Sequence, residues 1–120
     1  GPEAIDYVAG AGCGLAVDAI EARAVARALA RSVPHGSILG QTGDCMAAGA
    51  LRIASAIYAF ERQALPGTVG AEEPDPEAPV PGFVREPRAA RVHAVLVPTV
   101  AQGGSDSAVV LTAGPDAPAR

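Results

Sequence analysis

The sequence predicts an α/β fold in which a mixed sheet carries a buried helix and ends in an antiparallel hairpin. Two short apolar runs alternate with two helical segments over residues 4–64, which is the strand-helix-strand-helix order of a layered α/β sheet. The helix within residues 40–64 has almost no polar face, so we expect it to be buried on most sides. Two further apolar runs flank the turn sequence QGGSD at 102–106, which predicts the hairpin.

The first predicted strand, residues 4–8, leads into the glycine-rich sequence AGAGCG at 9–14. A helix follows from about Asp18, because Glu21 comes three residues later and completes a capping-box pattern. We expect this helix to be amphipathic and half exposed, with Glu21 among its polar residues. Its predicted apolar face consists of Ile20, Ala24, Val25, Ala28 and Leu29.

A Val-Pro pair ends this helix, and residues 36–39 form the second predicted strand. The turn at 40–43 then leads into the apolar helix, in which Arg52 is the only charge between residues 45 and 60. Such a helix needs more cover than a short chain supplies, so we expect a partner or a further part of the protein against it. Its charges and its many alanines make it a poor membrane span.

Residues 65–90 hold six prolines and have no periodicity, which predicts a long irregular connection that packs over a surface or a neighbour. An acidic cluster within it is expected to be solvated; its members are Glu72, Glu73, Asp75 and Glu77. The strongest predicted strand follows at residues 91–100, although Pro98 should limit its later pairing. Residues 108–112 form the returning strand of the hairpin.

The composition describes one domain whose core is filled by alanine and aliphatic side chains, since the chain has two Phe, two Tyr and no Trp. The net charge of −4 gives no nucleic-acid footprint. Two cysteines without a signal peptide suggest a reducing cytoplasm, where a structural disulfide is not expected. Gly1-Pro2 is typical of tag removal, so residues 1–3 are set apart from a domain at 4–113. Residues 114–120 are expected to form a disordered tail.

Four side chains could carry chemistry. His35 and His93 each stand alone, without a spaced partner, so a structural role is the simpler interpretation for both. Cys13 and Cys45 follow presumed strands in glycine-rich loops, where open α/β sheets build their sites. Their separation matches no zinc motif, and the preferred interpretation is that of small buried residues. The sequence predicts neither a metal nor a cofactor.

Several motifs occur in an order and spacing that resemble one family. IDYV at 5–8, a glycine-rich loop and DAIEARAV at 18–25 are followed by TGDCMAAGAL at 42–51. Further along come QALPGT at 63–68, PDPE at 74–77 and GGSDSAVVL at 103–111. Together they resemble the C-terminal portion of a β-ketoacyl synthase, the condensing enzyme of fatty-acid and polyketide assembly. The resemblance covers nearly the whole chain and implies a partial thiolase-like half.

In active members of that family, the first segment holds a His-Gly-Thr-Gly-Thr motif and the second holds a Gly-His. The resemblance places the first His position at Ala11 or a neighbour, and the second at Asp44 or Gly43. None of these residues can act as an imidazole. The Lys that the family often carries before the second motif falls near Leu39, and the motif of the nucleophilic Cys lies outside this chain.

The resemblance therefore implies no catalytic residue in this chain. The residues that remain as candidates for lining a substrate pocket are Cys13, Asp44, Cys45, Gly103, Gly104 and Ser105.

These losses resemble the chain-length factor of type II polyketide synthases, whose first loop is likewise free of His and similar to GAGCGLAVD at 10–18. The resemblance implies a non-catalytic subunit that forms a heterodimer with an active ketosynthase, helps to shape the acyl tunnel and receives substrate from an acyl carrier protein. Nucleic acid and membrane are not expected partners. Arg85, Arg88 and Arg91 are a candidate contact for an acidic partner, although a solvated surface is the simpler interpretation.

Two other functions remain open. One is an acyltransferase-type enzyme that uses Cys45 or Cys13 at the altered site, since a helix N-terminus stabilises a thiolate. The other is a small interaction domain that retains only the fold. Two strands and a helix that open the family's C-terminal half are missing, so the chain is a fragment, one chain of a split protein or a small descendant that docks on a partner.

Overall fold

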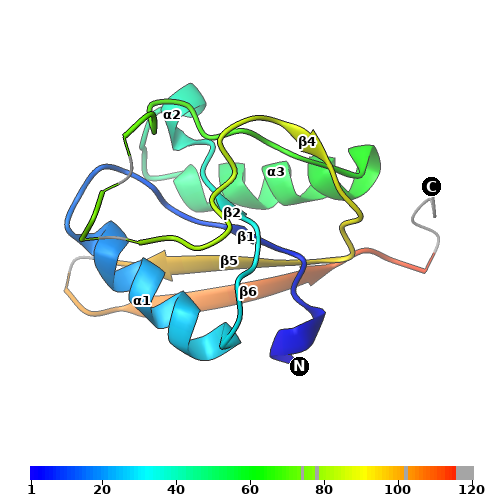
Figure 1. Ribbon diagram of the computed structural model, residues 1–120, viewed down its shortest axis with the longest axis horizontal. Helices are drawn as coiled ribbons and strands as arrows, with labels where there is room; N and C mark the ends of the chain where they lie inside the picture. The colour runs from blue at the N-terminus through cyan, green and yellow to red at the C-terminus, as the bar shows by residue number, and fades with distance from the viewer. Residues whose placement is uncertain (74, 78, 102, 116–120) are drawn as a thin grey trace.

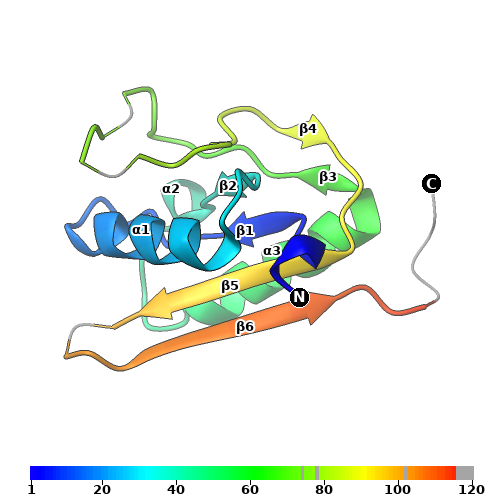
Figure 2. The ribbon, with the colours of Figure 1, turned by 60° about the horizontal axis from the view of Figure 1, so that its bottom comes forward.

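The computed structural model describes residues 1–73, 75–77, 79–101 and 103–115. The sheet has four strands in the order β2-β1-β5-β6, and helices α1 and α3 cover its two faces (Figures 1 and 2). The predicted α/β fold with a mixed sheet and a C-terminal hairpin is therefore confirmed. The described part of the chain contains no helix with the length and apolar character to cross a membrane.

The sheet is parallel except for its last strand. β1 (Tyr7–Ala9) lies between β2 (His35–Gly36) and β5 (Ala94–Val100), and it pairs with both in parallel. β6 (Asp106–Thr112) returns antiparallel to β5. Pro98 does not stop this pairing, which continues to Val100 opposite Asp106, so the predicted limit was wrong.

Strand ends also differ from the prediction. Residues 2–4 form a short 3-10 helix, η1 (Pro2–Ala4), so β1 begins three residues later than expected and continues to Ala9. β5 starts at Ala94, which leaves His93 exposed before the strand rather than within it. β6 begins two residues before the predicted position 108.

Two hydrophobic clusters fill the two sides of the sheet, because successive side chains of a strand point to opposite faces. On the α3 side, Tyr7, Ala9, Val95 and Val97 pack with Ala56, Ala59 and Phe60. On the α1 side, Val8 and Ala94 pack with Val25, Leu29 and Val33. The core is therefore made mainly of small and aliphatic side chains, as the composition predicted.

Helix α1 (Val17–Leu29) begins without a side-chain cap, so the predicted capping box was wrong. Asp18 instead accepts hydrogen bonds from the backbone amides of Cys13, at 3.2 Å, and Gly14, at 2.8 Å. Glu21 is buried, with 3% exposed, whereas Ile20 is 52% exposed. Ala24 and Ala28 are also exposed, so the buried face is rotated from the predicted one and includes Ala22, Val25 and Leu29.

The second strand is shorter than predicted. β2 ends at Gly36, and the expected turn at 40–43 is replaced by a short helix, α2 (Leu39–Thr42). Gly43 ends α2 with φ of 75°, a conformation that favours glycine. The apolar helix α3 (Ala48–Arg62) then starts five residues after Gly43.

Helix α3 is buried on one side only. Ala48, Arg52, Ala56, Ala59 and Phe60 face the sheet. Ile57, at 49% exposed, and Tyr58, at 62% exposed, lie on the outer side. The prediction of burial on most sides was therefore wrong for this chain, because nothing in the described residues covers the outer face of α3.

The long connection runs past the β2 edge of the sheet (Figure 2). At its ends, β3 (Ala64–Leu65) and β4 (Arg88–Ala89) form a two-stranded antiparallel ribbon. Between them, Phe83 forms a parallel bridge with His35. The four acidic residues of the predicted cluster at 72–77 are exposed, as predicted. Positions 74 and 78 of the connection, 102 of the predicted turn and 116–120 of the predicted tail lie outside the described residues.

Candidate functional site

The loop of residues 10–14, which we call the glycine loop, follows the carboxyl end of β1. Gly12 has φ of 55°, and a Cβ atom there would lie 2.7 Å from Ser37 Cβ, so no larger residue fits. The amide of Ala11 donates to Glu21 Oε1 at 2.9 Å, and the Ser37 hydroxyl donates to the Ala11 carbonyl. Both backbone polar groups of Ala11, the candidate position of the first family His, are therefore held by side chains.

Cys13 lies in this loop, beside the start of α1. Its Sγ donates to Asp18 Oδ1 at 3.3 Å, and the same carboxylate accepts from the Cys13 amide. Burial and the Asp18 carboxylate raise the pKa of the Cys13 thiol, and the charge of Asp44 acts in the same direction. The thiol is thus kept protonated, which is the opposite of an activated nucleophile.

Asp44 and Cys45 lie in the exposed segment between α2 and α3. Cys45 is a free and exposed thiol, and its carbonyl accepts a hydrogen bond from the Ala48 amide at 2.9 Å. The charge of Asp44 is the smallest of the effects that raise the pKa of the Cys13 thiol. Asp44 and Cys45 are neighbours in sequence within the exposed segment.

Gly103, Gly104 and Ser105 lie in the turn between β5 and β6. This turn closes on itself, since the Gly104 amide donates to Ala101 O at 3.2 Å and the Ala101 amide donates to Ser105 O at 3.3 Å. Figure 2 shows it at the same end of the sheet as the glycine loop. Among the described residues, no hydrogen bond joins the turn to that loop, so it forms a separate part of this end of the molecule.

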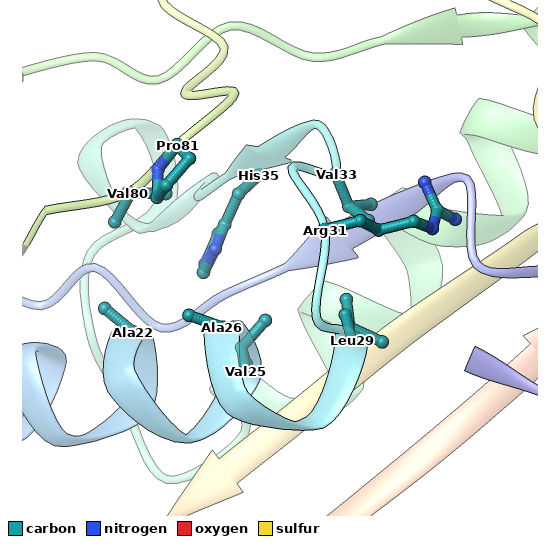
Figure 3. Close-up of a pocket in the computed structure, with 9 residues that line it drawn as sticks. All are labelled: Ala22, Val25, Ala26, Leu29, Arg31, Val33, His35, Val80 and Pro81. Atoms are coloured by element: carbon teal, nitrogen blue, oxygen red, sulfur yellow. The ribbon is translucent and has the colours of Figure 1, made fainter. Parts of the chain in front are cut away.

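The main cavity lies on another side of the glycine loop. It measures about 360 Å³ and is lined by that loop, by the start of α1 with Asp18 and Glu21, by β2 with Ser37, and by residues of the connection that include Thr68 and Phe83. Neither cysteine lines it, and nor do Asp44 or the hairpin turn. A smaller cavity of about 30 Å³ lies between α1 and β2, beside His35 (Figure 3), and is large enough for about one water molecule. The predicted pocket residues therefore do not define either cavity.

Three buried polar side chains were not predicted as part of the site. Glu21, Arg52 and His35 are 3%, 4% and 9% exposed, respectively. Glu21 Oε1 lies 3.8 Å from His35 Nε2, and Glu21 Oε2 lies 3.9 Å from Arg52 Nη1. The signal in the sequence was Arg52, because a single charge on an otherwise apolar helix needs a buried partner. Among the described residues, no group of three or more potential ligands could hold a metal ion.

A comparison of the sequence with known protein families gives a match. A family model described as the C-terminal domain of beta-ketoacyl synthase matches residues 1–72. The chain belongs to this family. The match includes the glycine loop, the segment with Asp44 and Cys45 and all of α3, so three of the candidate pocket residues, Cys13, Asp44 and Cys45, lie within the matched domain.

A curated relative covers nearly all of the chain. "Putative polyketide beta-ketoacyl synthase 1" of Streptomyces halstedii is 37% identical over an alignment of 117 residues, and the match covers 93% of this chain and 28% of the relative. This β-ketoacyl synthase chain therefore spans 28% of the length of that relative.

Solved structures share the fold. The ishigamide ketosynthase/chain length factor matches with a TM-score of 0.85 at 23% identity, over 93% of this chain and 28% of that chain. The type II complex AntDE:AntF, of an acyl-carrier protein with its ketosynthase bound to the hexaketide, matches with a TM-score of 0.80 at 20% identity, over 95% and 29%. The partial thiolase-like fold predicted for the β-ketoacyl synthase domain is thus confirmed.

Proposed function

We propose that this chain is the ketosynthase-like C-terminal part of a non-catalytic subunit, of the chain-length-factor kind, in a type II polyketide synthase. One observation carries the proposal: neither histidine of the chain lies at an expected imidazole position. His35 is buried in β2 beside Glu21, and His93 is exposed at the start of β5. Ala11 and Asp44, the candidate positions, offer a methyl group and a carboxylate instead.

The chemistry around these positions also supports a non-catalytic role. Leu39, near the position of the family's Lys, is a buried apolar residue at the start of α2. The Cys13 thiol is held by Asp18 with a raised pKa. Ala11, Asp44 and Leu39, which stand at or near the family positions, therefore offer neither an imidazole to polarise a thioester nor a cation in place of that Lys.

The outer face of α3 supports pairing with other protein. Ala50, Ala54, Ile57 and Tyr58 are exposed and recur at helical spacing, and Glu61 is the acidic residue at the end of this row. A contiguous apolar helix face of this kind is typical of an interaction surface. We infer that an active ketosynthase is the partner, which would make the assembly a heterodimer that shapes the acyl tunnel.

An acyl carrier protein is the inferred source of substrate, as in the AntDE:AntF complex. Arg85, Arg88 and Arg91 are all exposed beside the β3-β4 ribbon, which gives an acidic carrier a basic surface to contact. Glu86 lies among them, and the Arg85 guanidinium donates to the Glu72 carbonyl at 3.4 Å. The two unpaired cysteines are consistent with the proposed cytoplasmic location.

The test is co-purification of the tagged chain with an active type II ketosynthase, followed by product analysis with carrier protein and extender substrate. We expect a stable complex whose product length changes when the chain is omitted. A well-folded chain without affinity for any type II ketosynthase would contradict the pairing. Condensation by the chain alone would contradict the non-catalytic role.

A second candidate function rests on Cys45, the exposed free thiol that precedes α3. Its position near a helix N-terminus suits a nucleophilic thiolate in an acyltransferase-type reaction. A thioester probe should then acylate Cys45 faster than a small peptide thiol at the same pH. Equal rates would remove this candidate, and they would leave the interaction-domain hypothesis to be tested by the product analysis above.

A further inference from the structure

A buried ion pair crosses the carboxyl end of the sheet. Arg52 comes from α3 on one face, and Glu21 comes from α1 on the other (Figure 2). Both side chains are 4% exposed, and their charged groups approach to 3.9 Å at Arg52 Nη1 and Glu21 Oε2. They can meet because β1 ends at Ala9, which leaves a path between the two helices.

The Arg52 guanidinium forms hydrogen bonds to both β1 and β5 at the carboxyl end of the sheet. Its Nη1 donates to the carbonyls of Pro98, at 2.6 Å, and Ala9, at 3.4 Å, and its Nη2 donates to Thr99 Oγ1 at 3.0 Å. The ladder between β1 and β5 stops at the pair Val8 and Leu96, so no strand amide pairs with the carbonyl of Ala9 from β5. Where β1 and β5 separate, hydrogen bonds from the Arg52 guanidinium therefore take the place of the strand-to-strand hydrogen bonds.

Glu21 holds the glycine loop. Its Oε1 accepts the Ala11 amide at 2.9 Å and lies 3.8 Å from His35 Nε2. The His35 ring points from β2 towards α1, as Figure 3 shows. Glu21 Oε2 and Arg52 Nε are buried without a hydrogen-bond partner. Burying a carboxylate oxygen without a hydrogen bond is unfavourable. The charge of Arg52 therefore stabilises Glu21 Oε2 in its buried position.

We propose that Arg52 is a positioning residue, which acts through Glu21 to fix the glycine loop at Ala11. Through this chain of contacts, α3 determines the conformation of the loop that also carries Cys13. The inference rests on the proposed function only in treating the glycine loop as part of the acyl tunnel. It predicts that loss of the Arg52 charge loosens the loop while the fold persists.

The two thiols of the 120-residue chain provide the test. Cys13 is half-buried in the glycine loop, and Cys45 is exposed outside it, so the ratio of their alkylation rates reports the loop alone. For Arg52→Met we expect the Cys13 rate to rise roughly tenfold relative to Cys45, which corresponds to a loss of local stability of about 1.4 kcal/mol. Arg62→Met is the matched control, because Arg62 is an exposed residue in the last turn of the same helix.

Two further variants keep the test decisive. If Arg52→Met fails to fold, the double variant Glu21→Gln/Arg52→Met carries the test, since it leaves no unpaired buried charge. Arg52→Lys keeps a cation near Glu21 and should bring the ratio back towards that of the unmodified chain. Each variant is measured without denaturant, after circular dichroism has shown that it is folded.

The outcomes separate the two proposals. An unchanged ratio in folded Arg52→Met or the double variant, or equal ratios for the Lys and Met variants, would overturn the positioning role. Neither result bears on pairing with a ketosynthase. Conversely, a chain that fails to bind a ketosynthase but shows the expected ratios would contradict the proposed function and support the positioning role.

Discussion

The Cys13 thiol donates a 3.3 Å hydrogen bond to the Asp18 carboxylate, and this contact joins the glycine loop to the first turn of α1. A carboxylate beside a thiol disfavours the thiolate, in addition to the effect of burial. The candidate site thus contains a cysteine whose surroundings suppress its reactivity. This relationship separates Cys13 from cysteines that act as nucleophiles.

We predict that Asp18→Asn lowers the pKa of the Cys13 thiol, because it removes the nearest negative charge and keeps a hydrogen-bond acceptor. The midpoint of the alkylation-rate profile against pH should shift to lower pH. The measurement uses iodoacetamide on a Cys45→Ala background, so that one thiol reacts. Asp75→Asn, which changes an exposed acid in the long connection, is the control and should leave the midpoint where it was.

A second prediction concerns Tyr7, whose hydroxyl is buried without a hydrogen-bond partner. Burial raises the pKa of Tyr7 far above its ordinary value of 10.0. Above pH 10 the unfolded chain loses this proton and the folded chain keeps it, so the free energy of unfolding should fall as pH rises. Urea unfolding at pH 8 and pH 10.5 measures the fall.

Tyr7→Phe should remove the part of that fall that comes from Tyr7, and the raised pKa of the Cys13 thiol accounts for a further part in every variant. The substitution should cost little stability at pH 8, because the Tyr7 hydroxyl makes no hydrogen bond. Tyr58→Phe is the matched control, since Tyr58 is 62% exposed on α3. An alkaline fall that is identical in the two variants would show that Tyr7 is not its source.

The sequence predicted elements well where hydrophobic period decided them, and it failed where a distant contact decided them. The hairpin of β5 and β6 and the existence of α1 and α3 follow from local patterns. Asp18 and Glu21 have the spacing of a capping box, but the amides of the glycine loop reach both carboxylates and change their roles. Local spacing does not contain that information, because the loop position depends on β2.

The candidate site also has parts that local motifs identify and parts that only distant contacts identify. The glycine loop and the segment before α3 could be identified from their motifs. The partners of Arg52 lie on α1, β1 and β5, 31 to 47 positions away in sequence, so only the folded chain identifies them. The exposed side of α3 had a sequence signal, namely a helix too apolar for the cover available.

A third prediction compares two glycines. Gly12→Ala should destabilise the chain, because φ is 55° there and the new methyl group would lie 2.7 Å from Ser37 Cβ. Gly49→Ala should stabilise it by about 1 kcal/mol, since Gly49 lies in α3 with open space at its Cβ position. Urea unfolding of both variants measures whether each substitution lowers or raises the free energy of unfolding. A stabilising Gly12→Ala would mean that the glycine loop adopts another conformation.

The last prediction concerns the outer face of α3. Ile57 is 49% exposed there, and Ile20 is 52% exposed on α1, so the two residues form a matched pair in size and exposure. If a ketosynthase covers α3, Ile57→Asp places a charge in a desolvated interface and should weaken binding by at least about tenfold, which is about 1.4 kcal/mol. Ile20→Asp should leave binding unchanged.

Both variants should fold like the parent, because surface substitutions have small effects on stability. Titration calorimetry with the purified ketosynthase measures the two affinities. Equal weakening by both would place the interface elsewhere, whereas loss confined to Ile57→Asp would assign it to the face that this chain leaves uncovered.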